Sequence, residues 1–399
     1  MSPIRDSWRY TLPVALLLMA PFDILASLAM DIYLPVVPAM PSELDATPIV
    51  IQLTLSIYIA VLGVGQLIFG PISDRIGRRP VILCGGFLFT SASFGLASSS
   101  SVVFFVLLRS AQALGASAVL VATFATVRDV YANRQESVTI YGLFSSILAF
   151  VPALGPIAGA MIANEFGWRA IFVTLGTVSL LATVNALLWW NETRPVNASL
   201  VRRRFRPVLE SPAFWTYTLG FSAAMGTFFL FFSTAPSVLI ERADYSELQF
   251  SLAFSTVAIV MIITTRFTRR LIERMGIARS LSSGMVALIL GAALLCVGEF
   301  LEWPSFATFV LPMWVMAIGI VFAVSVTANG ALAGLEDVAG SAVALYFCTQ
   351  SLIVTLLGTV VLVALRSDTA WPIVVYSLLM AAAVLTALRM LRRYDRVQQ

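Results

Sequence analysis

The sequence lacks two residue types that carry much of protein chemistry. Its 399 residues include no histidine and no lysine, so all 25 basic residues are arginine. The absence of histidine excludes Ser-His-Asp and Cys-His catalysis and histidine-ligated metal sites. The absence of lysine excludes Schiff-base chemistry and phosphate binding by a P-loop lysine. A proton relay in this chain must therefore use carboxylates, with arginine as the fixed positive charge.

Charged residues are also scarce. They make up 12% of the chain, whereas 59% is hydrophobic and the mean hydropathy is +0.92. A soluble domain carries roughly 25% charged residues, so this composition excludes a soluble protein and predicts an integral membrane protein. The cysteines Cys84, Cys296 and Cys348 lie in apolar runs without metal-ligand or disulfide spacing. We expect no metal and no cofactor and, because the arginines form no basic domain, no nucleic-acid partner.

Twelve apolar runs are long enough for membrane-spanning helices, which need about 20 residues each. They occupy residues 12–37, 49–72, 80–98, 102–123, 138–163, 169–190, 211–236, 249–268, 280–298, 304–327, 338–363 and 370–390. Their length and even apolarity favour helices over barrel strands, in which polar residues would alternate. The sequence therefore predicts an all-α membrane protein with twelve transmembrane helices.

Arginine is distributed unevenly between the two sides of the predicted bundle. The side that carries both termini has 21 arginines, the opposite side has three, and Arg109 lies inside a span. Because arginine is enriched in cytoplasmic loops, both termini are predicted to be cytoplasmic.

A short pattern recurs at half the chain length. Asp74-Arg75-Ile76-Gly77 lies between the second and third spans, and Glu273-Arg274-Met275-Gly276 lies 199 residues later, between the eighth and ninth. Two parallel six-span halves are the architecture of transporters that rock around a central site. We predict pseudo-symmetric halves over residues 1–190 and 211–399, joined by a cytoplasmic linker over residues 191–210.

Three motifs resemble those of the major facilitator superfamily. The segment from Gly70 to Pro80 is similar to the signature between its second and third helices. The segment from Arg109 to Gly115 resembles its fourth-helix motif, with alanine at 113 where the family usually has glycine. Gly142, Gly155, Pro156 and Gly159 resemble the fifth-helix motif of proton-antiport exporters, with Val151 and Ala160 at positions where glycine is preferred.

The resemblance extends over nearly the whole chain to one branch, the exporters of phenicol antibiotics. The similar segments are Met19–Pro35, Ala122–Tyr131, Phe232–Pro236 and Phe322–Gly330. The resemblance implies a proton-coupled antiporter of the bacterial inner membrane that exports chloramphenicol and florfenicol and confers resistance. Its expected partners are the drug, protons and the lipid bilayer, and we expect a monomer and no enzymatic activity.

Charges deep inside the predicted spans occur only in the first half, at Asp23, Asp31 and Arg109. An intramembrane charge costs at least about 2.5–3.5 kcal/mol, so each needs a partner or a use. From the helical rise, Asp23 lies about 17 Å above the start of its span, Asp31 about 12 Å higher, and Arg109 between them. We predict that these residues couple proton binding to transport, with Asp23 foremost and Asp31 as a second or alternative site. A helix-pairing salt bridge is the alternative.

The motif between the second and third spans is predicted to be a conformational latch. In this interpretation Asp74 caps or pairs across helices when the cytoplasmic side is closed and releases when it opens. The alternative is a solvated positive anchor, because an exposed ion pair contributes only about 0–1 kcal/mol. The predicted latch residues are Gly70, Asp74, Arg75, Gly77, Arg78 and Arg79.

The fifth span is predicted to contain a gate. Proline removes a backbone donor inside a helix, so Gly155-Pro156 should interrupt regular hydrogen bonding and give a kink. Gly159, one turn further on, completes the predicted gate.

The drug-binding residues are predicted from the resemblance, in which the first and seventh spans flank a central cavity. Phenylalanines there would suit a neutral aromatic drug by stacking and apolar burial. The alternative is that these aromatic residues face lipid or pack within the protein. The predicted substrate contacts are Asp23, Tyr33, Gln112, Phe228, Phe229 and Phe232, and Gln112 could instead orient Arg109.

Other functions remain as alternatives to phenicol export. A broader multidrug exporter and a proton-coupled metabolite transporter share the same superfamily. A membrane-embedded enzyme or a receptor is disfavoured, because the sequence has neither a nucleophile–base pair nor an extramembrane signalling domain.

Overall fold

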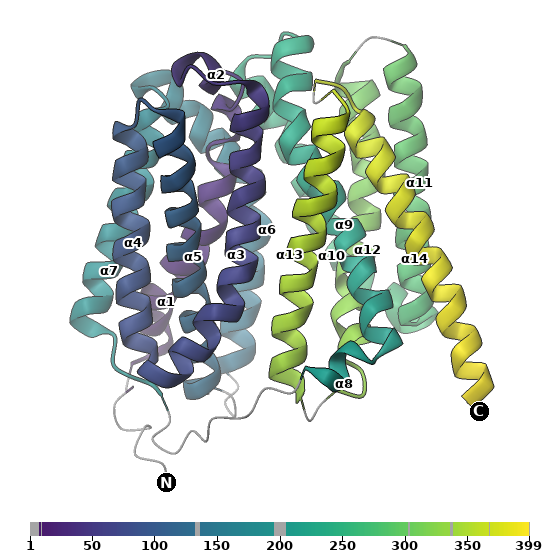
Figure 1. Cartoon of the computed structure of the whole chain (residues 1–399), viewed down its shortest axis with the longest axis horizontal. Helices are drawn as coiled ribbons and strands as arrows, with labels where there is room; N and C mark the ends of the chain where they lie inside the picture. Colours follow the sequence, from purple (N-terminus) through teal and green to yellow (C-terminus); the bar gives the residue numbers. More distant parts are fainter. Residues whose placement is uncertain are drawn as a thin grey trace. The chain divides into compact units, whose positions relative to one another are not determined.

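A computed structural model describes most of the chain (Figure 1): residue 8 and residues 10–131, 136–194, 205–301, 304–335, 338–366 and 368–398. Only the backbone is described at residues 137, 138, 141, 142, 145–149, 339, 340 and 394–398. The central part of the predicted linker, residues 195–204, lies outside the described residues.

The first half of the chain contains six long helices. Its elements are α1 (Leu12–Asp31), η2 (Leu34–Val36), α2 (Met40–Glu43), α3 (Pro48–Ile76), α4 (Arg78–Ser98), α5 (Val102–Tyr131), α6 (Glu136–Phe166) and α7 (Arg169–Trp189). The long ones correspond to the first six predicted spans. Several extend beyond the predicted limits, as α5 does by a further two turns, because charged ends stay helical outside the apolar stretch that hydropathy detects.

The second half repeats this series. Its elements are α8 (Arg206–Leu209), α9 (Pro212–Pro236), η3 (Ser237–Arg242), α10 (Glu247–Met275), α11 (Ile277–Phe300), η4 (Phe306–Val310), α12 (Leu311–Leu332), α13 (Ala339–Ala364) and α14 (Trp371–Gln398). In the described part of the chain, 11 helices are long and apolar enough to cross a membrane. The remaining long helix, α6, adds a shorter apolar stretch over Phe150–Phe166.

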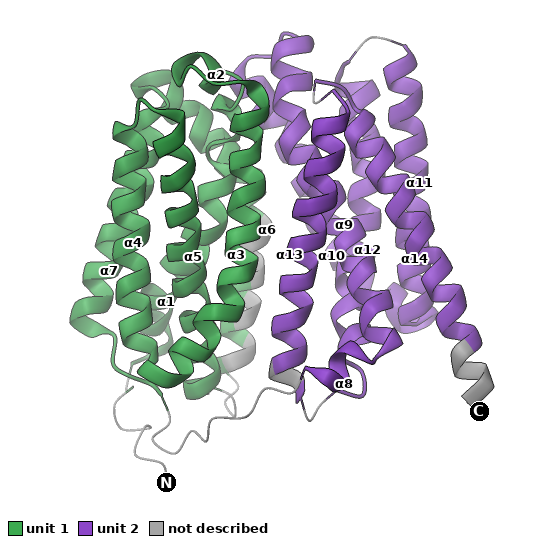
Figure 2. Cartoon of the chain, in the orientation of Figure 1, with its two compact units in different colours: residues 1–202 green, residues 203–399 purple. Residues whose placement is uncertain are grey.

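The chain forms two compact units, Met1–Arg202 and Arg203–Gln399 (Figure 2). The six long helices pack on one another in the same order in both units. In each, the third helix contacts the fourth and the sixth, and the second contacts the fourth. The first helix, α1 or α9, contacts the fourth, fifth and sixth. Identical packing order in the two units is the structural counterpart of the repeated sequence pattern.

The repeated pattern marks the same turn in both units. Gly77 joins α3 to α4 with φ +110°, and Gly276 joins α10 to α11 with φ +77°. Both conformations belong to glycine, because a Cβ clashes with the backbone at positive φ of this kind. The turn therefore explains why glycine recurs at this point of each half.

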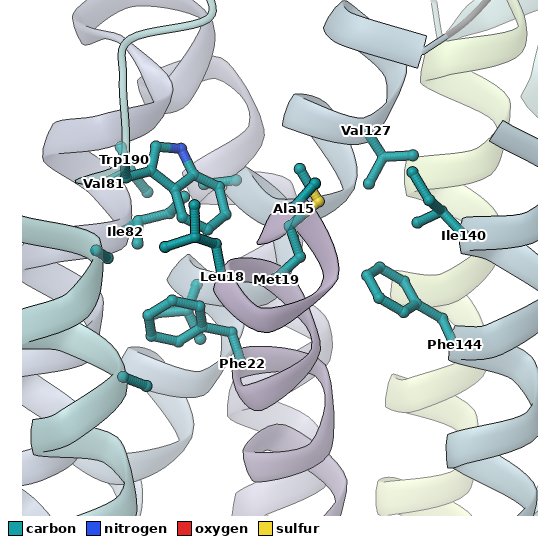
Figure 3. Packing of buried hydrophobic residues seen from close by; sticks show 14 of the residues in the cluster. Ala15, Leu18, Met19, Phe22, Val81, Ile82, Val127, Ile140, Phe144 and Trp190 are labelled. Carbon is teal, nitrogen blue, oxygen red and sulfur yellow. The ribbon is translucent and has the colours of Figure 1, made fainter. Parts of the chain in front are cut away.

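A buried hydrophobic cluster fills unit 1 near the end where α1 begins (Figure 3). Residues of α1 occupy its centre, with α6 on one side and the start of α4 on the other. Trp190, directly after α7, packs edge-on against Phe22 of α1 and Trp8, with ring centroids 6.0 and 5.4 Å apart. The Trp8 indole donates to the Tyr131 hydroxyl at 3.0 Å. The chain leaving α7 is thus held in the core of unit 1.

Candidate functional site

The carboxylate of Asp23 is buried on α1 without a partner. Its side chain has 0% exposure, and neither oxygen accepts a hydrogen bond from any residue that the structure describes. Phe22 and Leu25, which lie close to it on α1, are also buried. An ionised carboxylate in such surroundings is costly unless it is paired or neutralised.

Asp31 is the last residue of α1 and is covered by α6. A Cβ built on Gly155 would lie 2.9 Å from the Asp31 Cβ, so the two backbones are close. A Cβ on Gly159 would lie within 1.8 Å of the Ile32 carbonyl oxygen, where only glycine fits. The glycines of the predicted gate therefore let α6 approach the end of α1 and bury Asp31.

The predicted gate lies inside a single helix. The α6 helix is continuous from Glu136 to Phe166, with Pro152 and Pro156 inside it. Because proline has no backbone N–H, each of these prolines removes one hydrogen bond of the regular helical pattern. Whether α6 bends at Pro156 during transport stays a prediction.

Arg109 of α5 is fully buried in an aromatic cage. Its guanidinium lies over the rings of Tyr58, Tyr33 and Phe172, with its carbon 4.8, 5.0 and 6.0 Å from their centroids. Such cation–π contacts replace part of the lost hydration of the charge. Its Nη1 donates to the Ala29 carbonyl at 3.1 Å, which places it between the two aspartates along α1, as the helical rise predicts.

The salt-bridge alternative for Arg109 is not the arrangement in the structure. Among the described residues, no ion pair joins its guanidinium to Asp23 or Asp31. Its Nε and Nη2 have no hydrogen-bond partner within the same described part. Arg109 therefore holds a fixed positive charge beside α1 with donors still available.

Gln112 orients Arg109. Its Oε1 accepts from Arg109 Nη1 at 2.6 Å, and its Nε2 donates to the Ser93 hydroxyl at 2.9 Å. Ser93 in turn donates to the Phe89 carbonyl at 2.7 Å, so the chain of bonds reaches α4. Because both ends of the Gln112 amide are occupied and buried, the structure supports its orienting role over its predicted substrate contact.

Tyr33 is likewise packed inside unit 1. Its hydroxyl lies 3.2 Å from Thr54 Oγ1, and its ring contacts Arg109 and Phe172. Tyr58, which the sequence interpretation missed, completes the cage and donates to the Ala26 carbonyl at 2.8 Å. No signal in the chain distinguishes Tyr58 from other membrane tyrosines, because its importance comes from its neighbours.

Arg78 is the centre of the predicted latch. Its side chain is 3% exposed and bridges two acids: Nη1 donates to Asp74 at 2.7 Å and Nε donates to Asp129 at 2.8 Å. Nη1 also donates to the Ser73 hydroxyl at 3.2 Å. Asp74 lies 3.8 Å from Arg128 of α5 as well. Asp74 of α3 therefore contacts arginines of α4 and α5, although its own side chain is 42% exposed.

Two acids of this cluster were missed. Asp129 follows an arginine at the end of the fourth span, and that pairing is the signal that could have indicated it. Glu192 accepts the backbone N–H groups of Arg78 at 2.9 Å and Arg79 at 3.2 Å. Arg79 also donates through Nη2 to the Leu187 carbonyl at 2.8 Å.

The other two predicted latch residues contribute in different ways. The carbonyl of Arg75 accepts a hydrogen bond from the guanidinium of Arg194. Gly70 is half-buried inside α3, directly before Pro71. Only the first of these belongs to the polar cluster around the turn.

The predicted drug-contacting phenylalanines of α9 differ in their surroundings. Phe229 packs against α13, where a Cβ on Gly358 would lie 3.2 Å from its ring. Phe232 lies edge-on to Phe228 and Phe254, with centroids 4.7 and 5.0 Å apart. Phe229 and Phe232 are buried, whereas Phe228 is half-buried. Packing within unit 2 thus accounts for the burial of Phe229 and Phe232.

Comparison with known proteins adds sequence likeness to this geometry. A sequence profile described as Major Facilitator Superfamily matches residues 22–359. The chain is 49% identical over 386 residues to the chloramphenicol resistance protein of Pseudomonas aeruginosa, covering 96% of this chain and 92% of that protein. It is 26% identical over 385 residues to the bicyclomycin resistance protein homolog of Haemophilus influenzae, covering 93% of each.

Solved structures share the fold at low sequence identity. A crystal structure of a D-xylose–proton symporter has a TM-score of 0.77 at 14% identity, covering 94% of this chain and 97% of that one. A crystal structure of the peptide transporter POT in complex with sulfate has a TM-score of 0.73 at 14% identity, covering 96% and 94%. These likenesses show the fold alone, and they confirm the predicted helical architecture.

Proposed function

The chain belongs to the Major Facilitator Superfamily, and we propose that this membrane transporter exports phenicol antibiotics in exchange for protons. Transport, not enzymatic catalysis, is the activity of this family. The observation that carries the choice of substrate is 49% identity, over 96% of the chain, to a protein named for chloramphenicol resistance. In this proposal chloramphenicol and florfenicol leave the cell unmodified, and resistance follows because their internal concentration falls.

The proposed setting is the bacterial inner membrane, with both termini and the α3–α4 turn in the cytoplasm. The excess of 21 arginines over three on the opposite side supports this orientation. A monomer is the proposed working unit, because a single chain carries both halves of the transporter. We keep the predicted boundaries of residues 1–190 and 211–399, with the linker at 191–210 between them.

Asp23 is the proposed principal site of the coupled proton. Its burial without a partner supports this role, because a carboxylate there is stable only when a proton or a positive group accompanies it. Arg109 is the proposed fixed charge, since two of its guanidinium nitrogens remain without partners in the described structure. Asp31, covered by α6, is the second or alternative site.

Phe228 is the best supported of the proposed drug contacts. It keeps partial exposure on α9, whereas Phe229 and Phe232 are buried within unit 2. A neutral nitroaromatic or sulfonylphenyl drug would gain affinity from stacking and apolar burial against such a ring. Tyr33 and Gln112 are less supported, because their polar groups already bond within unit 1.

Uptake of labelled chloramphenicol into inside-out vesicles tests the proposal. Vesicles with the protein should accumulate unmodified drug when their interior is acidified, and an ionophore that collapses the pH gradient should abolish accumulation. Vesicles from cells without the gene provide the background. Resistance that appears only with chemically altered drug, or the absence of pH-driven accumulation, would contradict the function.

The same vesicles separate the two remaining alternatives. Accumulation of several chemically unrelated drugs at comparable rates would favour a broader multidrug exporter. Drug-independent movement of a metabolite together with protons would favour the metabolite transporter.

A further inference from the structure

The turn between α3 and α4 is bound by a carboxylate that is distant in sequence. Glu192 accepts four backbone N–H groups: those of Arg78 and Arg79 at 2.9 and 3.2 Å, and those of Thr193 and Arg194 at 2.9 and 2.8 Å. The first two belong to the first turn of α4, whose amides have no acceptor within the helix. The residue before them is Gly77, which has no side chain to cap the helix.

A negative charge at this place is favourable for a second reason. The amino end of a helix carries a partial positive charge, and an anion there stabilises the helix. Glu192 thus replaces the missing cap of α4 from a position 114 residues away. It fixes the main chain of Arg78, while Asp74 and Asp129 hold the side chain of the same residue.

Glu192 lies in a short segment that contacts three helices of unit 1, α3, α4 and α5. We call residues 192–194 the clasp. Thr193 is fully buried, with its hydroxyl 3.4 Å from Thr126 of α5, and Arg194 donates to the carbonyl of Arg75 at the end of α3. Only Trp190 and Asn191 lie between the end of α7 and the clasp. The chain that leads to the second unit therefore departs from the latch itself.

The equivalent turn of the second unit provides a comparison. Gly276 forms the same turn, yet a Cβ built on it would meet nothing within 4 Å, whereas one on Gly77 would lie 2.3 Å from Glu192 Oε2. The ion pair that Glu273 makes is with Arg269 on its own helix, at 3.0 Å and largely exposed. The clasp thus distinguishes the first copy of the repeat from the second.

From these contacts we infer that Glu192 is a positioning residue of the latch: it holds the start of the interdomain linker to the first turn of α4 and places Arg78 between its two acids. This inference deepens the proposed export function, because the latch must open and close in each transport cycle. Because the clasp is bound to α4, the first residues of the linker move together with α4 and not with α7 alone.

Thiol labelling of a buried clasp position tests the binding role of Glu192 without any transport. The chain carries Thr193→Cys, with Cys84, Cys296 and Cys348 replaced by alanine, and reacts with a maleimide in detergent. Glu192→Ala should speed labelling about 30-fold, since hydrogen bonds to a charged group hold the clasp, and Glu192→Gln about threefold. The control Glu210→Gln removes an exposed ion pair with Arg206 and should leave the rate unchanged.

Asp74→Asn separates the clasp from the latch side chains. It weakens the grip on the Arg78 side chain but leaves the backbone bonds to Glu192, so labelling should stay within twofold of the parent rate. Equal labelling with glutamate, glutamine or alanine at 192 would overturn the inference. Acceleration by Asp74→Asn as large as that by Glu192→Ala would also overturn it, because the clasp would then depend on the latch.

Export rates test the positioning role. Glu192→Gln should lower the maximal rate of chloramphenicol export several-fold and change KM less than twofold. The double variant Asp74→Asn with Glu192→Gln should export no more slowly than the slower of the two single variants. If the export rate falls only in proportion to the amount of folded protein, Glu192 has a structural role only, and this result would contradict the inference. If the parent protein moves no drug, the proposed function fails, while the labelling experiment still decides whether Glu192 holds the clasp.

Discussion

Replacing Gly77 with alanine should harm the protein more than the same change at Gly276, although both glycines form equivalent turns. Their φ values are +110° and +77° and their ψ values are 164° and 165°. Only glycine adopts this region readily, so alanine costs about 1–3 kcal/mol at either position. The backbone strain is therefore matched, and Gly276→Ala is the control for it.

The difference between the two variants comes from Glu192. An alanine Cβ at position 77 would lie 2.3 Å from Glu192 Oε2, so the carboxylate must move away. The N–H groups of Arg78 and Arg79 then lose their acceptor. Each hydrogen bond to a charged group contributes about 1.5–3 kcal/mol, and water replaces part of this at the partly exposed turn. We expect a net penalty of about 2 kcal/mol, or roughly 30-fold in the opening equilibrium of the clasp.

Two measurements check this magnitude. Labelling of Thr193→Cys should be roughly 30-fold faster with Gly77→Ala and unchanged with Gly276→Ala. In combination with Glu192→Ala, Gly77→Ala should add no further acceleration, because the clash is gone and only backbone strain remains. Equal labelling of the two alanine variants, or full additivity with Glu192→Ala, would refute the reasoning.

The remaining predictions concern the buried charges and the latch. Asp23→Asn should abolish pH-driven export while the protein stays folded, as fluorescence-detected size exclusion can verify. Asp31→Asn should impair export less. If Asp23→Asn still exports drug with full coupling to protons, the coupling role moves to Asp31. Arg109→Lys should reduce export at least tenfold, because an ammonium cannot spread over two tyrosine rings and donate in a fork, and retained activity in vesicles would contradict this. Asp74→Asn and Asp129→Asn should slow turnover more than they weaken drug binding, and a parallel loss in equilibrium binding of labelled drug would show otherwise.

The membrane fold could be predicted from the sequence because the bilayer imposes a simple rule. Each span must satisfy its own backbone hydrogen bonds and present about 20 apolar residues, so composition along the chain is enough to locate it. The turn at Gly77 and its copy at Gly276 are equally local, since positive φ combined with ψ near 165° is a region that essentially only glycine adopts. The depth of Arg109 between Asp23 and Asp31 followed from the helical rise alone.

The helix ends were less well determined by the sequence. Hydropathy reports only the part of a helix that lipid surrounds, so the charged last turns of α5, around Arg128 and Asp129, lay outside the predicted span. Pro156 lies inside the helix α6, where it leaves no backbone N–H for the regular pattern, and whether the helix bends there stays a prediction.

Only the tertiary structure decided which charges and rings meet. Tyr58 and Phe172 reach Arg109 from other helices, and the Arg78 side chain turns to Asp129, 51 residues away. The two copies of the repeated turn look alike in sequence, yet only the first is held by Glu192. Such contacts depend on how helices pack, and an ion pair or a cap forms wherever packing brings a donor to an acceptor within about 3 Å. Sequence spacing sets the face on which a residue lies; the partner that it finds on a neighbouring helix is a property of the folded chain.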